Sequence, residues 1–193
     1  GGMQTFQTGY SGGKGARMIG SFELQIGEVI NILVGQMGED TRVNTQNNAA
    51  PGGGGGTFIW KKANSYLYLA AGGGGGGGRS SHLGIDANSS TKGNDALGVE
   101  NSGGSEGNGS LPNSSGRSFW AGGGAGWFTN GTGGNNNNLY DHTGGGSGAD
   151  AGVRPLEGGW GGERYSDGKD EGGDGGFGGG GGGGSDNMGT GGG

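Results

Sequence analysis

The chain has 193 residues, of which 62 are glycine and 3 are proline, and its glycines do not follow the Gly-X-Y period of collagen. Hydrophobic residues make up only 26%, so a folded state must depend on backbone hydrogen bonds more than on buried side chains. The net charge of −6 with scattered Lys and Arg excludes a nucleic-acid partner, and the absence of cysteine excludes disulfides and thiolate metal sites.

Two apolar stretches predict strands. In the first, residues 21–26 and 29–34 have the alternation of half-buried strands, and Gly27-Glu28 between them predicts a hairpin with a type II′ turn. In the second, residues 57–61 and 66–70 are rich in aromatic and β-branched side chains around a turn near 63–65, which predicts another hairpin. Two facing hairpins would form a small antiparallel β-sandwich. Its expected core is Phe22, Leu24, Ile26, Ile30, Ile32, Val34, Phe58, Leu67 and Leu69.

Glycine runs follow and interrupt these strands. They are Gly52–Gly56, Gly72–Gly78, Gly122–Gly124, Gly144–Gly146 and Gly178–Gly184. Polyglycine can form a left-handed threefold helix, the polyglycine II helix, and such helices pack side by side because they lack Cβ atoms. A flexible linker is the alternative, but here the runs abut strand ends directly, as at Ala71-Gly72. We expect one domain over 1–193, with strands and the first glycine segments in 1–70 and glycine helices in 71–193.

Three polar stretches, 79–118, 130–141 and 163–174, predict long solvated surface loops. An alanine in place of Gly103, within the first of them, is expected to be nearly silent. Four Asn-x-Ser/Thr sequons lie in or near these loops and are candidate glycosylation sites if the chain passes through a secretory pathway. Their asparagines are Asn88, Asn108, Asn113 and Asn130.

No pattern predicts catalysis or a cofactor. His82 and His142 are the only histidines, and neither has the spacing of a catalytic triad or a zinc site. Gly12-Gly13-Lys14-Gly15 lacks the Ser or Thr that follows the lysine of a phosphate-binding loop. The acidic residues Asp167, Asp170, Glu171 and Asp174 lack calcium-loop spacing, so a solvated face is favoured over a calcium site. We expect no enzyme, no cofactor and no metal.

Large aromatic residues stand beside the glycine runs. They are Trp120, Trp127, Phe128, Trp160 and Phe177. They favour caps that shield the backbone hydrogen bonds of the glycine helices, and the alternative is an exposed binding site for a partner. No apolar run approaches the ~20 residues of a membrane-spanning helix, so we expect any membrane anchor to lie outside this chain.

Several segments, in order, carry a resemblance to a known family. They are Gly20 to Leu24, Ile32 to Asp40, Gly52 to Phe58, Leu69 to Gly72, Ala121 to Trp127, and Gly175 to Gly184. This series resembles the glycine-rich extracellular domain of the anaplastic lymphoma kinase and leukocyte tyrosine kinase receptors. The resemblance implies a strand sandwich similar to tumour necrosis factor, into which a bundle of polyglycine II helices is inserted. It also implies an extracellular location, either secreted or in a cell-surface ectodomain, and no kinase in this chain.

Two functions remain open on the sequence. The first is a non-enzymatic extracellular structural protein whose copies associate with one another, through exchanged strands or stacked glycine helices, into a fibre. The alternative is the ligand-binding ectodomain of a receptor that recognises a small protein cytokine, as the resembled receptors do. The first is favoured, because the chain has no cysteines to pin an isolated domain and both ends are glycine-rich segments that need neighbours.

Overall fold

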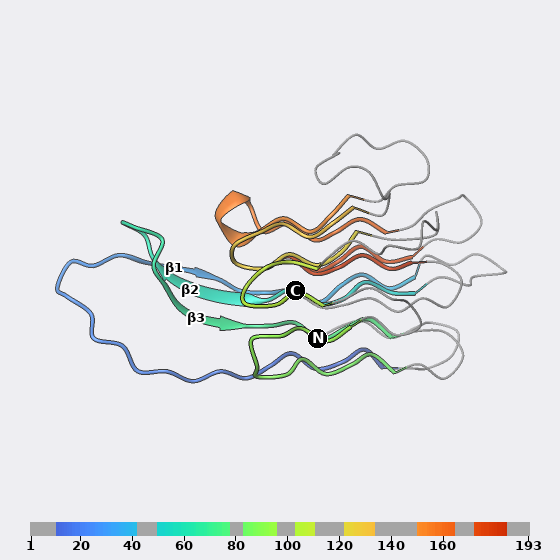
Figure 1. The fold of residues 1–193 in the computed structure, drawn as a ribbon, viewed down its shortest axis with the longest axis horizontal. Coiled ribbons are helices and arrows are strands. Elements are labelled where there is room, and N and C mark those ends of the chain that lie inside the picture. Colours follow the sequence, from blue (N-terminus) through green and yellow to red (C-terminus); the bar gives the residue numbers. More distant parts are fainter. Residues whose placement is uncertain are drawn as a thin grey trace.

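The fold is mainly β, with one open sheet of three antiparallel strands. A computed structural model describes residues 11–41, 50–77, 83–95, 103–110, 122–133, 150–164 and 172–184. The strands are β1 (Ile30–Leu33), β2 (Thr57–Lys61) and β3 (Leu67–Ala71), in the order β1-β2-β3 (Figure 1). The only helical element in the described ranges is the short 3-10 turn η1 (Pro155–Glu157).

The second predicted hairpin is confirmed. β2 and β3 pair antiparallel, with Phe58 opposite Ala70 and Ile59 opposite Leu69, and a register irregularity follows between Ile59 and Trp60. The aromatic and β-branched residues of this hairpin suit the pleated surface of a sheet. Its connecting turn covers Lys62–Asn64, close to the predicted position.

The first predicted hairpin is wrong. Residues 21–26 are not a strand, and β1 pairs with β2, Leu33 opposite Phe58 and Ile30 opposite Lys61. A turn does form near the expected place, since the N–H of Glu28 donates to the carbonyl of Gln25 at 3.0 Å. Gly27 is at its third position with φ of 84°, which a type II turn requires, so the predicted type II′ turn is also corrected. The alternation correctly identified residues within 29–34 as strand-forming, but the strand that pairs with them is the distant β2 and not the adjacent segment.

The core lies between one face of the sheet and two aromatic side chains of the glycine segments. Leu33, Phe58 and Trp127 are buried together, and Trp60, Leu67, Ala70 and Phe177 pack against them. Phe58 and Leu67 were predicted core residues and do join this cluster. The described residues contain no second sheet facing the first, and glycine segments take that place.

Five other predicted core residues are exposed, so the predicted sandwich core is wrong at these positions. They are Phe22, Leu24, Ile26, Ile32 and Val34. In β1 the residue that enters the core is Leu33, one position away from the predicted Ile32, and a shift of one residue along a strand changes the face. Ile30 and Leu69 are half-buried and lie outside the core cluster. In β1 the covered face is thus the one opposite to the face chosen from the alternation, whereas in β2 the predicted Phe58 is on the covered face.

The glycine segments pack side by side beyond the sheet, and we call them the glycine bundle (Figure 1). The segment Gly52–Gly56 is buried at every position, and its consecutive N–H groups donate to three neighbours in turn. The pairs are Gly52 to Glu39 (2.9 Å), Gly53 to Gly181 (2.8 Å), Gly54 to Gly74 (2.9 Å), Gly55 to Gln36 (2.9 Å) and Gly56 to Gly178 (3.0 Å). The first and fourth donors reach one neighbouring segment, and the second and fifth reach another. Bonding therefore repeats every three residues, whereas a β-strand alternates between two sides.

The close spacing of these segments requires glycine. A Cβ added at Gly55 would overlap the backbone carbonyl of Phe177, and one at Gly52 would overlap the carbonyl of Asp174. The expectation for Gly103 is wrong for the same reason, because a Cβ added there would overlap the carbonyl of Gly93 in the neighbouring segment. Gly103 therefore lies in a closely packed part of the chain, and an alanine there is not expected to be silent.

The register of the sheet continues into the glycine bundle. Counting three and six residues on from the pair Leu33·Phe58 gives Gln36·Gly55 and Glu39·Gly52, and both pairs are hydrogen bonded. Counting three residues on from Thr57·Ala71 gives Gly54·Gly74, which is also bonded. Each strand and the glycine segment that continues it thus form one straight unit (Figure 1).

Candidate interaction surface

The face of the sheet that points away from the core carries a row of aliphatic side chains. Ile32, Ile59 and Leu69 lie directly opposite one another across β1, β2 and β3. Ile32 is 58% exposed, and Ile59 and Leu69 are half-buried. Aliphatic neighbours across strands stabilise a sheet, but contiguous exposed apolar surface of this kind marks an interaction site. We call these three residues the apolar row.

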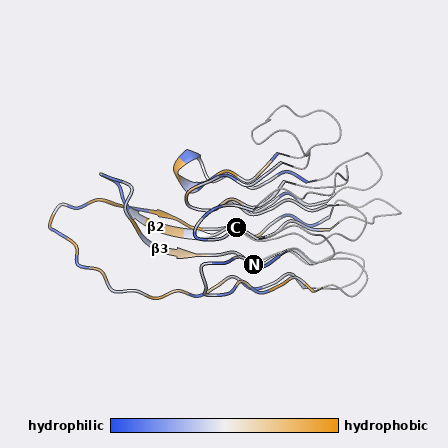
Figure 2. Cartoon of the chain, in the orientation of Figure 1, coloured by the Kyte–Doolittle hydropathy of each residue, from blue (hydrophilic) through white to orange (hydrophobic). Residues whose placement is uncertain are grey.

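Six of the thirteen other exposed large apolar side chains in the described ranges lie in the segment that leads into the sheet. Among the described residues they include Met18, Ile19, Phe22, Leu24, Ile26 and Val29, followed by Val34 and Met37 after β1. Figure 2 shows apolar colouring along this segment and on β2 and β3, while the glycine bundle is pale. Among the described residues, exposed large apolar side chains are therefore more numerous around the sheet than in the glycine bundle.

The outer edge of β3 is open. Within the described ranges β3 pairs only with β2, so the other edge presents unpaired backbone groups. Residues 11–16 bond to the glycines that follow β3, and the last of these bonds joins Ala16 N–H to the carbonyl of Gly72 at 2.9 Å. Beyond Ala16 the chain leaves the glycine bundle and runs as a separate extended segment before it reaches β1 (Figure 1). An open strand edge is a template for pairing with another strand.

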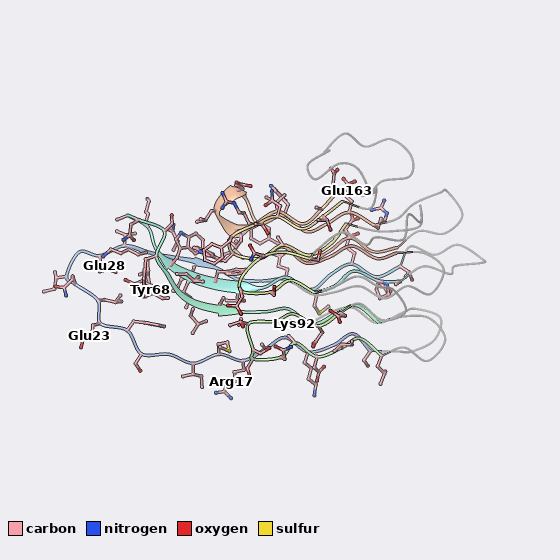
Figure 3. The ribbon with its side chains drawn as sticks, viewed as in Figure 1. Arg17, Glu23, Glu28, Tyr68, Lys92 and Glu163 are labelled. Carbon is pink, nitrogen blue, oxygen red and sulfur yellow. The ribbon has the colours of Figure 1, made fainter. Side chains whose placement is uncertain are left out.

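A polar cluster fixes the end of the sheet next to this edge. The hydroxyl of Tyr68 donates to Glu28 Oε1, and Lys61 Nζ lies 3.1 Å from Glu28 Oε2. Glu28 and Tyr68 meet at the end of the molecule far from the bundle (Figure 3). The hydrogen bonds that Glu28 accepts from Tyr68 and Lys61 lower the pKa of Glu28. The hydrogen bond to Glu28 raises the pKa of Tyr68 to about 12. The cluster ties the turn Gln25–Glu28 to β2 and β3.

These shifts predict how stability depends on pH. Because the pKa of Glu28 is lowered, its contribution is present above the unfolded value of ~4.3 and is lost as the pH falls below it. Because the pKa of Tyr68 is raised, its contribution is present below ~10 and is lost as the pH rises toward about 12. The Tm difference between the wild type and Tyr68→Phe should therefore be largest between about pH 5 and 10 and shrink on both sides. Calorimetry across pH measures it, and a difference constant from pH 3 to 12 would contradict the assignment.

Tyr66→Phe is the matched control for this series. Tyr66 is 62% exposed and stacks edge-on against Tyr68 with ring centroids 5.4 Å apart. Removal of its hydroxyl keeps that ring contact and leaves the bond between Tyr68 and Glu28 in place. We expect its Tm to follow the wild type at every pH.

The aromatic residues beside the glycine runs divide into two groups. Trp127 packs on Phe58 and Trp60, with centroids 5.9 and 5.6 Å apart, so it is part of the core. Phe128 is 59% exposed, and Trp160 is 66% exposed although it meets Phe177 edge-on at 6.0 Å. Trp127 is therefore buried in the core, whereas Phe128 and Trp160 present aromatic surface, and shielding of the glycine backbone stays a prediction. Trp120 lies outside the described residues.

Three of the four sequon asparagines are described, and each side chain already makes hydrogen bonds. Asn88 Nδ2 donates to Lys92 and to Asn94, and Asn130 Nδ2 donates to Glu157 Oε2 at 3.1 Å. Asn108 Nδ2 donates to the carbonyl of Ser105 at 3.0 Å, which uses one of its two amide hydrogens. Asn113 lies outside the described residues. Glycosylation stays a prediction at all four.

Most of the histidine and acidic residues considered for catalysis or metal binding fall outside the described ranges. These are His82, His142, Asp167, Asp170 and Glu171. Asp174 is described, and both of its oxygens are used by Arg164, through the backbone N–H at 2.9 Å and the guanidinium at 2.8 Å. Within the described ranges no group of three or more metal-ligating side chains comes together.

Sequence reasoning missed the apolar row and the open edge of β3. Ile32 and Leu69 were recognised as apolar but assigned to the core, because alternation separates two faces without showing which one is covered. The Glu28–Tyr68 cluster was also missed, since the two residues lie forty positions apart. The one available signal was an excess of apolar residues over what a single small sheet can bury.

Comparisons with known proteins add no relative. No protein-family model, curated protein or solved structure matches this chain. In the part that the structure describes, no helix has the length and apolar character needed to cross a bilayer. A function for the chain therefore has to follow from its own surface and bundle.

Proposed function

We propose that this chain is a non-enzymatic extracellular structural protein whose copies associate with one another into fibres. The observation that carries the proposal is the open edge of β3 beside the apolar row, at the end of a rigid glycine bundle. Surface of this kind on one strand edge favours association with another strand, and a second copy offers both an edge and an apolar face. The resemblance to glycine-rich receptor domains supports the extracellular location.

We also propose that the bundle segments are polyglycine II helices. The support is the three-residue repeat of hydrogen bonds along Gly52–Gly56 and the lack of room for a Cβ at Gly52 and Gly55. In this interpretation the bundle acts as a stiff rod, and the tumour necrosis factor-like sandwich is completed only when further strands join the open sheet. Stiffness without a large hydrophobic core suits a structural element.

Sedimentation and electron microscopy of the purified chain test the proposal. We expect association that increases with protein concentration and ends in filaments with a regular repeat. Ile32→Asp places a charge in the apolar row and should lower the association constant by about tenfold or more, the effect of losing about 1.4 kcal/mol of interface energy. Thermal unfolding should change little, because Ile32 is 58% exposed.

Leu83→Asp is the matched control, because Leu83 is 60% exposed and belongs to the glycine bundle, away from the sheet. It should associate like the wild type. A wild-type chain that stays monomeric at every concentration would contradict the proposal and favour the ligand-binding ectodomain. Equal loss of association in the two variants would place the interface elsewhere than the apolar row.

A further inference from the structure

We infer that residues 17–21 are the missing fourth strand of this sheet and that they close onto the outer edge of β3 within the same chain. We call these residues the strap. The closed register places Arg17 opposite Ala71, Ile19 opposite Leu69 and Ser21 opposite Leu67. In the structure the strap stands open, apart from β3 (Figures 1 and 3).

The register follows from the hydrogen bonds that precede the strap. Ala16 N–H bonds to the carbonyl of Gly72 at 2.9 Å, and Gly13 N–H bonds to that of Gly75 at 2.8 Å. These two pairs define one antiparallel ladder between residues 11–16 and the glycines after β3. The next residues in the same ladder are 17–21 on one side and 71–67 on the other.

Two other hydrogen-bonded ladders continue from the glycine bundle into the sheet, and they justify extending the register of this ladder to the strap. The ladder between Gln36–Glu39 and Gly52–Gly55 keeps its register as it passes into β1 and β2. The ladder through Gly54 and Gly74 keeps its register as it passes into β2 and β3, as far as the pair Ile59·Leu69. The third ladder is the only one of these three that stops at the boundary between bundle and sheet.

The side chains of the strap match both faces of the sheet. In the closed register Ile19 extends the apolar row, next to Leu69, and it is 81% exposed in the open form. Met18 comes opposite Ala70, which places it in the same cross-strand row as the core residues Phe58 and Leu33. Agreement on both faces is a strict test, because a slip of one residue would put every strap side chain on the wrong side.

One contact of the closed form is already present. The rings of Phe22 and Tyr68 lie with centroids 5.1 Å apart. The closed register puts Gly20 opposite Tyr68, so Phe22 is the diagonal neighbour of Tyr68, a relation in which long aromatic side chains still touch. The strap is therefore tethered at both ends, by Ala16 and by Phe22, and its closure in the same chain is favoured by the high effective concentration of a short tether.

Closure would cover the edge and lengthen the apolar row. If copies associate through that edge, a consequence that rests on the proposed function, then the closed strap is autoinhibitory and the open strap permits assembly. The register itself does not depend on assembly.

Paired cysteines test closure, and the natural chain contains none. Directly opposite residues in an antiparallel pair have Cα atoms about 4.5–5.5 Å apart, a separation suited to a disulfide. In dilute protein with a mild oxidant, Ile19→Cys with Leu69→Cys should form an intramolecular disulfide at least about tenfold faster than Gly20→Cys with Leu69→Cys, whose sulfurs face opposite sides of the sheet. Mass spectrometry of non-reduced peptides locates the bond. Equal rates in the two pairs would overturn the inference, and a covalent dimer in place of the intramolecular bond would assign the strand to a second copy.

Hydrogen exchange provides a readout that does not need the cysteines. The backbone amides of β3 that point away from β2 should exchange more slowly in the wild type than in the variant Ile19→Asp. In that variant a charged side chain beside Leu69 would destabilise the closed strap. Unchanged exchange would contradict closure. For the assembly consequence, the double variant Ile19→Cys with Leu69→Cys should associate less when oxidised than when reduced. If the wild type never associates while the intramolecular disulfide still forms, the proposed function fails and the strap stands.

Discussion

A chain in which Gly55 is replaced by alanine should unfold at a markedly lower temperature than the wild type. The added Cβ would overlap the carbonyl of Phe177, which is backbone of a neighbouring segment and cannot rotate aside as a side chain can. The neighbouring N–H of Gly56 donates to the carbonyl of Gly178, so the two segments cannot separate there without stretching a bond of 3.0 Å. Overpacking of this kind costs about 3 kcal/mol. For a chain of this size that loss corresponds to roughly 6–12 °C in Tm, measured by calorimetry.

Gly20→Ala is the control for the same chemical change. The three atoms nearest to a Cβ at Gly20 all belong to the ring of Phe22, a side chain that is 42% exposed and can shift more easily than a neighbouring backbone. We expect a change within about 0.5 kcal/mol. Equal Tm values for the two variants would mean that the bundle tolerates side chains and that its close packing does not set the stability of the chain.

The glycine bundle could be anticipated from the sequence, but its neighbours could not. Runs such as Gly52–Gly56 and Gly178–Gly184 can pack side by side because they lack Cβ atoms, and their contact with strand ends argued against linkers. Which segments meet is decided by bonds such as Gly53 to Gly181, which join residues far apart in a chain where every run looks alike. Nothing in a glycine run encodes its partner, so the partner follows from the segments that flank it.

The strands show the same division between local and long-range information. The hairpin of β2 and β3 was predictable because a short turn joins its two strands. Residues 21–26 carry an equally clear alternation and still form no strand, and β1 pairs instead with the distant β2, through pairs such as Leu33·Phe58. Local pattern thus identified strand-forming residues, while the pairing came from tertiary contacts.

The candidate surface was the least predictable part, because its residues look like core residues. Ile32 would be buried in a sandwich, and it is exposed here because the core lies on the other face of the sheet. Leu24 is exposed because its segment forms no strand. The signal that identifies the layer over the core face of the sheet is Trp127, which the sequence placed only beside a glycine run. An aromatic residue within a glycine segment can cap that segment or reach across to a sheet, and only the packed structure distinguishes the two.

Replacing Trp127 with alanine should test that layer directly and cost about 3–5 kcal/mol of unfolding free energy. Trp127 is 5% exposed, and its ring lies against Phe58 and Trp60, so its removal leaves a cavity between sheet and bundle. Trp160→Ala is the control, because Trp160 is 66% exposed and its ring contacts only that of Phe177 among the ring pairs of the described residues. Loss of this contact should cost about 1 kcal/mol of unfolding free energy. Calorimetry is the suitable measurement, since both variants lose tryptophan fluorescence. Were the two losses equal, the contact between sheet and bundle would contribute little and the backbone bonds of the glycine segments alone would hold the fold together.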